Sequence, residues 1–144
     1  MGRRTLVAVA RADGRYDCRY AHWGVDADPV AQSRPLGEGW TAAAVLEPLD
    51  ATYERLVVRD ERVLTYAVCW LDPALSDPDD IALARSDDLA ALRDWWVDRR
   101  DAAARAVDAG RTPDRVRTDL LAGLRTRAAA VHLPDDASFL RGGR

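Results

Sequence analysis

The sequence predicts an α+β domain in which a small, mainly antiparallel sheet carries an antiparallel pair of C-terminal helices on one face. Three observations lead to this fold class. An alternating stretch with a tight turn opens the chain, apolar segments rich in strand formers occupy its middle, and two segments with helical periodicity end it. We expect residues 1–144 to form a single domain, because no linker or internal repeat divides them.

The first sheet segment is predicted to be a β-hairpin over residues 4–22. The pair Asp13-Gly14 is favoured in tight hairpin turns, and the residues on either side of it are typical of strands. Strand side chains alternate between the two faces, so one face of the second strand is aromatic. The residues expected to share that face are Tyr16, Cys18, Tyr20 and His22.

Residues 23–85 are predicted to contain a loop, short helices and strands. Glycine and proline interrupt residues 23–39, which we expect to be a connecting loop with a short helix at residues 30–33. Residues 40–49 are compatible with a helix or a strand, and residues 49–57 are expected to form a short helix capped by Asp50. Strands are expected at residues 62–71, buried on both faces, and at residues 79–85.

The two helices are predicted over residues 87–109 and 112–130. Thr112 and Pro113 stand at the preferred cap and first helical positions of the second helix, and the short connection makes the pair antiparallel. We expect residues 138–144 to be a frayed tail. The side chains expected to face the sheet are Leu89, Leu92, Trp96, Leu120 and Leu124.

Composition limits the class of protein. With 48% hydrophobic residues, a chain of 144 residues can bury a core without disulfides, and two cysteines are too few for a disulfide framework. No apolar run approaches the roughly 18 residues of a membrane span, and the first residues do not resemble a signal peptide. We therefore expect a cytoplasmic protein without a membrane partner.

The charged residues are unusual in kind. All 21 basic residues are arginine, and 20 of the 24 acidic residues are aspartate, for a net charge of -3. A GC-rich genome and a cytoplasm adapted to concentrated salt would both favour this composition. Acidic residues intersperse with the arginines of the helices, which makes nucleic acid an improbable partner.

Several kinds of active site are excluded by spacing or absence. Cys18 and His22 would lie about 13 Å apart along a strand, too far to share one metal ion. The sequence contains no G-x-S-x-G motif and no phosphate-binding loop with its lysine. We therefore predict no metal and no cofactor, and we expect Cys18 and Cys69 to be buried core residues.

The most unusual tract is Tyr20-Ala-His-Trp-Gly24, which would place aromatic rings and an imidazole at the rim of the sheet. On the first helix, Trp95 lies at the edge of the apolar stripe, where it could pack internally or anchor a partner. The candidate binding residues are Tyr16, Tyr20, His22, Trp23 and Trp95.

Two hypotheses for the function follow. The first is a binding or regulatory module that contacts an unknown protein or small ligand through the Tyr20–Trp23 rim and the loop after it. The alternative is an enzyme acting on a small molecule with His22 as general acid or base. A closed pocket with a second polar group near His22 would favour the enzyme, and a flat aromatic patch would favour the module.

The N-terminal motifs also carry a resemblance. The start Met-Gly-Arg-Arg-Thr-Leu-Val-Ala, the Asp13-Gly14 turn and the segment Tyr20-Ala-His-Trp-Gly24 resemble those of a family of uncharacterised haloarchaeal proteins. The resemblance covers roughly the first 24 residues. It favours salt adaptation as the origin of the lysine-free surface, and it implies no activity.

Salt adaptation predicts a modestly lower melting temperature at low salt. The Debye length grows from about 3 Å at 1 M salt to about 10 Å at 0.1 M, so neighbouring aspartates repel one another more strongly. The effect is modest because the net charge is only -3. Thermal melts in potassium chloride at both concentrations measure it, and an unchanged or higher melting temperature at low salt would leave GC bias as the explanation.

Overall fold

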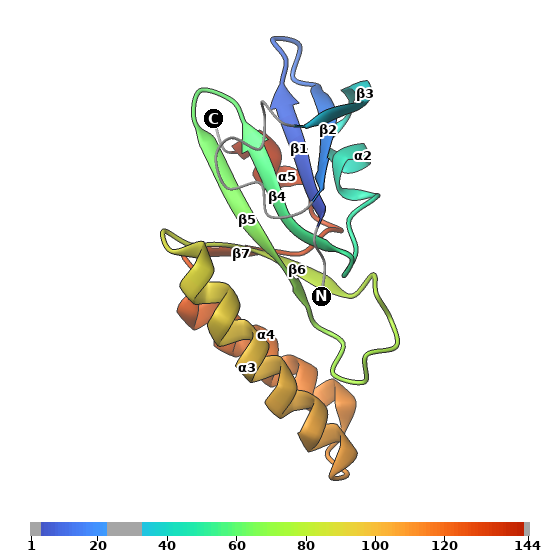
Figure 1. Ribbon diagram of the computed structural model, residues 1–144, viewed down its shortest axis with the longest axis vertical. Helices are drawn as coiled ribbons and strands as arrows, with labels where there is room; N and C mark the ends of the chain where they lie inside the picture. Colours follow the sequence, from blue (N-terminus) through green and yellow to red (C-terminus); the bar gives the residue numbers. More distant parts are fainter. Residues whose placement is uncertain (1–3, 23–32, 143–144) are drawn as a thin grey trace.

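A computed structural model describes residues 4–22 and 33–142, which form a twisted sheet with helices on both faces (Figure 1). The strands are β1 (Arg4–Ala10), β2 (Tyr16–His22), β3 (Arg34–Trp40), β4 (Tyr53–Arg59), β5 (Val63–Trp70), β6 (Ile81–Arg85) and β7 (Ala130–His132). The helices are α2 (Ala42–Leu46), α3 (Leu89–Asp108), α4 (Pro113–Arg127) and α5 (Ser138–Gly142). This architecture confirms the predicted α+β class.

The sheet has the strand order β3-β2-β1-β4-β5-β6-β7. Neighbouring strands are antiparallel throughout, with the exception of the central pair β1 and β4, which is parallel. The predicted N-terminal hairpin is confirmed, since Arg4–Ala10 pairs with Tyr16–His22 in antiparallel register. Its turn requires Gly14, whose φ of 83° lies in the left-handed region that favours glycine.

The topology contains the same order of elements twice. The first unit runs β1, β2, β3 and α2, and the second runs β4, β5, β6 and α3. In each unit the three strands form an antiparallel meander, and the two meanders meet through their first strands. This order is a property of the fold that residue patterns alone did not indicate.

The helices of the two units cover opposite faces of the sheet. Helices α2 and α5 pack on one face with side chains such as Leu6, Leu56 and Leu83. Helices α3 and α4 pack on the other face with Ala67 and Cys69, and their far ends extend beyond the sheet (Figure 1). The predicted C-terminal helix pair is thus confirmed, although the opposite face also carries helices.

The predicted inward-facing stripe of the helix pair is largely correct. Leu92, Trp96, Leu120 and Leu124 are buried, and Leu89 is partly buried. Two ion pairs add to this packing. Arg93 of α3 pairs with Glu54 of β4, and Arg117 of α4 donates two hydrogen bonds, of 2.8 and 2.7 Å, to the carboxylate of Asp80 before β6.

The helix expected at residues 49–57 is wrong. Tyr53–Arg59 forms strand β4 at the centre of the sheet. Asp50 does act as a local acceptor, since its carboxylate accepts a hydrogen bond from the Thr52 amide at 2.8 Å, but it closes a turn and caps no helix. Pairing on both sides with β1 and β5 decides the conformation of this segment.

The loop expected at residues 23–39 is wrong in its last part, where Arg34–Trp40 forms strand β3 through pairing with β2. Other expectations in ambiguous segments are also settled. Residues 40–49 contain helix α2, whose N-cap Thr41 accepts a hydrogen bond from Ala44 N. The expected tail instead folds as α5 over Ser138–Gly142, and Leu140 is buried. Residues 143–144 and most of the expected helix at residues 30–33 lie outside the described residues.

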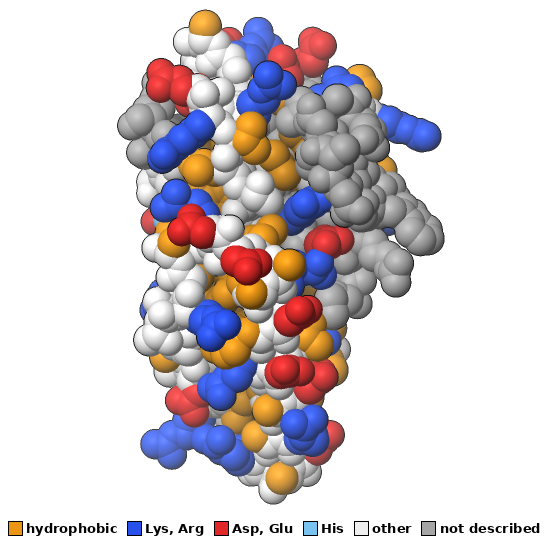
Figure 2. Space-filling model, turned by 60° about the vertical axis from the view of Figure 1, so that its left-hand side comes forward, with side chains coloured by type: hydrophobic (Ala, Val, Ile, Leu, Met, Phe, Trp, Pro, Cys, Tyr) orange, Lys and Arg blue, Asp and Glu red, His pale blue; other side chains and the backbone are white. Residues whose placement is uncertain are grey.

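Charged side chains of both signs lie on the surface of the molecule that includes helices α3 and α4. Figure 2 shows acidic and basic side chains interleaved on this face, with no extended region of one sign. An exposed pair, Arg111 and Asp119, lies 3.4 Å apart. Within residues 4–22 and 33–142, every helix is too short or too polar to cross a lipid bilayer.

The packing of Trp96 yields a stability prediction. Its side chain is buried, and its indole N–H finds no acceptor among the described residues. Trp96→Ala should lower the free energy of unfolding by about 3–5 kcal/mol, because it removes a buried ring and leaves a cavity. Trp96→Phe should cost less than half as much, since it keeps a ring and removes an unsatisfied donor.

Chemical denaturation of both variants and the wild type tests this prediction. Equal losses for the two variants would contradict it, because both lack the indole N–H and only Trp96→Phe keeps a ring in the core. A loss below about 1 kcal/mol for Trp96→Ala would contradict the burial of this helix face.

Candidate functional site

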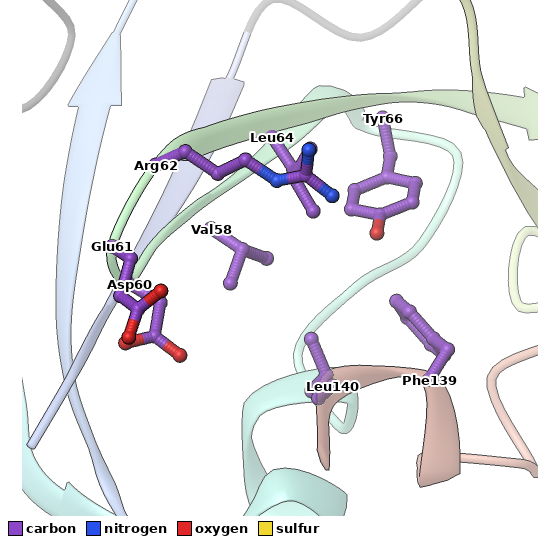
Figure 3. Close-up of a pocket in the computed structure, with 8 residues that line it drawn as sticks. All are labelled: Val58, Asp60, Glu61, Arg62, Leu64, Tyr66, Phe139 and Leu140. Carbon is purple, nitrogen blue, oxygen red and sulfur yellow. The ribbon is translucent and has the colours of Figure 1, made fainter. Parts of the chain in front are cut away.

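A cavity of about 380 Å³ opens between the β4–β5 hairpin and helix α5 (Figure 3). Its floor is apolar, since the side chains of Val58 and Leu64 project into it from paired positions of β4 and β5. Phe139 and Leu140 of α5 form the opposite wall. The remaining lining residues are Asp60, Glu61, Arg62 and Tyr66.

The charged groups of this pocket are separated in space. The carboxylates of Asp60 and Glu61 lie together at the hairpin turn, whereas the guanidinium of Arg62 extends over Leu64 toward the ring of Tyr66 (Figure 3). The Asp60 amide donates to the Arg62 carbonyl at 3.0 Å and holds this turn. None of these three side chains forms a hydrogen bond or ion pair with another described residue.

A second arginine stands beside Tyr66. Arg85 of β6 lies directly opposite Tyr66 of β5 in the antiparallel register, so both side chains are on the same face. Burial raises the pKa of the Tyr66 hydroxyl, and the positive charges of Arg62 and Arg85 oppose this effect. The net shift is upward, so the hydroxyl stays protonated at neutral pH and can donate a hydrogen bond.

Three aromatic rings, those of Tyr66, His132 and Phe139, pack together at the Tyr66 end of the pocket. The ring of His132 stacks on Phe139 at 4.2 Å with planes 7° apart, and Tyr66 meets both rings edge-on. Burial lowers the pKa of His132, Arg85 acts in the same direction, and Asp136 opposes both. The imidazole is therefore neutral at pH 7, which suits its stacked position.

The predicted site residues of β2 are placed differently. Tyr16 is buried, and its hydroxyl donates to the Leu140 carbonyl at 2.8 Å, so its contact is with α5. Tyr20 is half-buried beside the guanidinium of Arg4, whose central carbon is 6.0 Å from the ring centre. The side chain of His22 and the whole of Trp23 lie outside the described residues.

Trp95 is separated from those residues by the sheet. It packs with the second core cluster on α3, whereas Tyr16 and Tyr20 belong to the first cluster on the other face. The guanidinium carbons of Arg99 and Arg127 lie 5.9 and 5.5 Å from its ring centre. Among the predicted residues whose side chains the structure describes, Trp95 therefore lies apart from Tyr16 and Tyr20.

Metal and thiol chemistry find little support in residues 4–22 and 33–142. This part of the chain contains no group of three or more side chains able to hold a metal ion. Cys18 and Cys69 are buried and unbridged, as predicted, and burial raises the pKa of each thiol to about 12. Both thiols are therefore protonated and weakly nucleophilic.

The residues of the pocket were not singled out from the sequence. Asp60, Glu61 and Arg62 resemble an ordinary polar turn between two strands. A usable signal was the apolar pair Phe139-Leu140 in an expected tail, because a frayed end gains nothing from an aromatic ring.

Comparisons with known proteins give one partial match. Residues 1–43 match a family described as "Family of unknown function (DUF6735)". The matched segment contains β1, β2 and β3 and the N-terminal motifs, but none of the residues that line the pocket. No curated protein and no solved structure matches the chain. The similarity thus indicates a domain of unknown function and assigns no activity.

The environment of His132 predicts a pH effect on stability. Since its pKa is lower in the folded state, unfolding takes up a proton as the pH falls below the ordinary value of about 6.5. Stability should therefore decrease between that value and the lower folded-state pKa. His132→Phe keeps an aromatic ring against Phe139 and removes the proton.

Denaturation of wild type and His132→Phe at pH 7.5 and 5.5 measures this contribution. We expect the wild type to lose more stability than the variant over this range, with the carboxylates common to both as the internal control. An equal loss in the two proteins would show that His132 does not contribute to it.

Proposed function

We propose that the chain is a small cytoplasmic binding module that holds a small amphipathic molecule between the β4–β5 hairpin and α5. The observation that carries the proposal is the cavity itself, in which an apolar floor adjoins charged side chains that pair with no other described residue. Its volume of about 380 Å³ is within the range of small-molecule sites. Such a combination of surfaces favours a ligand with both apolar and ionic parts.

The proposal favours binding over catalysis. The two thiols are protonated and buried, and a nucleophile paired with a base does not occur among the residues that line the pocket. The enzyme that uses His22 stays a prediction, because the side chain of His22 lies outside the described part of the chain. Two free, buried cysteines agree with a cytoplasmic location.

The Tyr20–Trp23 rim and the loop after it remain a proposed surface for a protein partner. Within the described part of this rim, Tyr20 is half-buried and shares the guanidinium of Arg4 with Tyr53. Because the rim and the pocket use different residues, a partner at the rim and a ligand in the pocket are compatible.

Blocking the pocket tests the proposal. We expect a two-dimensional NMR titration of the wild type with a library of small amphipathic molecules to shift the amide signals of Val58, Leu64 and Phe139. Leu64→Trp places a bulky indole ring in the cavity and should abolish these shifts. Leu36→Trp makes the same exchange at an exposed position of β3, where the side chain is 45% exposed, and should preserve them.

Two outcomes would contradict binding in this pocket. The first is a wild-type protein whose pocket amides respond to no member of the library. The second is a response that survives Leu64→Trp unchanged.

A further inference from the structure

We propose that the ligand of this pocket is a zwitterion, with an ammonium group and an acid group joined by an aliphatic spacer. The inference rests on the proposed function and specifies its ligand class. It follows from the spatial order in which the pocket presents the carboxylates of the β4–β5 turn, the apolar side chains of both strands and the guanidinium of Arg62 near Tyr66 (Figure 3).

The positive end of the pocket suits a carboxylate. Arg62 and Arg85 both act on the Tyr66 hydroxyl, and the guanidinium of Arg62 lies on the pocket side of that ring. Neither guanidinium forms an ion pair or hydrogen bond with a described residue. A ligand carboxylate beside Tyr66 would accept a hydrogen bond from the Tyr66 hydroxyl and face two positive charges.

The negative end suits an ammonium group. The carboxylates of Asp60 and Glu61 point to the same side of the turn and away from the guanidinium of Arg62 (Figure 3). Two neighbouring carboxylates without a cation repel each other, and a ligand ammonium between them would relieve that repulsion. A ligand that carries only an acid group would leave the negative charges of Asp60 and Glu61 without a partner.

The apolar floor determines the length of the ligand's aliphatic spacer. Val58 and Leu64, which lie opposite each other on β4 and β5, separate the two ends, and Leu140 faces them from α5. The four steps along the backbone from Arg62 to Tyr66 span roughly 13 Å, and side chains leaning inward shorten the distance between charges. A linear spacer of about five methylene groups is compatible with this span, whereas an α-amino acid is too short to reach both ends.

Binding of three matched ligands tests the inference. The probes are 6-aminohexanoate, hexanoate and hexylamine, which share a chain and differ in their charged groups. We expect NMR titration of the wild type to give an affinity for 6-aminohexanoate about tenfold higher than for either of the others, because only the zwitterion satisfies both ends.

Two variants test which side chains bind the acid group of the ligand and which bind its ammonium group. Arg62→Gln should weaken 6-aminohexanoate and hexanoate but leave hexylamine unaffected. The double variant Asp60→Asn with Glu61→Gln should weaken 6-aminohexanoate and hexylamine but leave hexanoate unaffected. Arg59→Gln is the matched control, since Arg59 is exposed at the end of β4 and does not line the pocket, and it should change none of the three affinities.

The outcomes separate the inference from the proposed function. Hexanoate or hexylamine binding as tightly as 6-aminohexanoate would overturn the zwitterion and leave the binding module intact. The same holds if all three probes fail while other library members shift the pocket amides. If neither the probes nor the library shift those amides, both the inference and the proposed function are wrong.

Discussion

The parallel pairing of β1 with β4 is the contact on which the rest of the fold depends. Leu6 pairs with Leu56 and Val7 with Val57, and all four side chains are almost completely buried, two on each face of the sheet. Each such side chain contributes about 1.5–3 kcal/mol through burial. The pairing joins two antiparallel meanders into one sheet, so that α2 and α3, which follow the meanders, cover opposite faces.

Elements with a local cause could be predicted from the sequence. The N-terminal hairpin follows from an Asp-Gly turn between alternating strands, and α3 and α4 follow from periodicity and caps. Strand β4 could not be predicted in this way. The short segment after Asp50 is compatible with a helix or a strand, and only its pairing with β1 and β5 decides between them. Helix α5 has the same cause, since Leu140 is fixed by a surface contributed by residues far earlier in the chain.

The candidate site was hidden for a related reason. Alternation correctly placed Tyr16 and Tyr20 on one face of β2, but alternation does not say which face of a sheet is covered. Because α2 and α5 cover that face, Tyr16 is buried in the core and Tyr20 packs half-buried against it. The pocket instead arises where the sheet continues past the cover of α5, from a polar turn and two apolar residues near the C-terminus.

The hydrogen bond from Tyr16 to Leu140 spans 124 residues and links the second strand to the last helix. During synthesis on the ribosome, both meanders emerge and can pair before α5 leaves the exit tunnel. The wall formed by Phe139 and Leu140 is therefore added after both meanders, onto a sheet whose apolar surface is already in place. A nascent chain therefore has no complete ligand pocket until the segment that forms α5 has emerged and packed on the sheet.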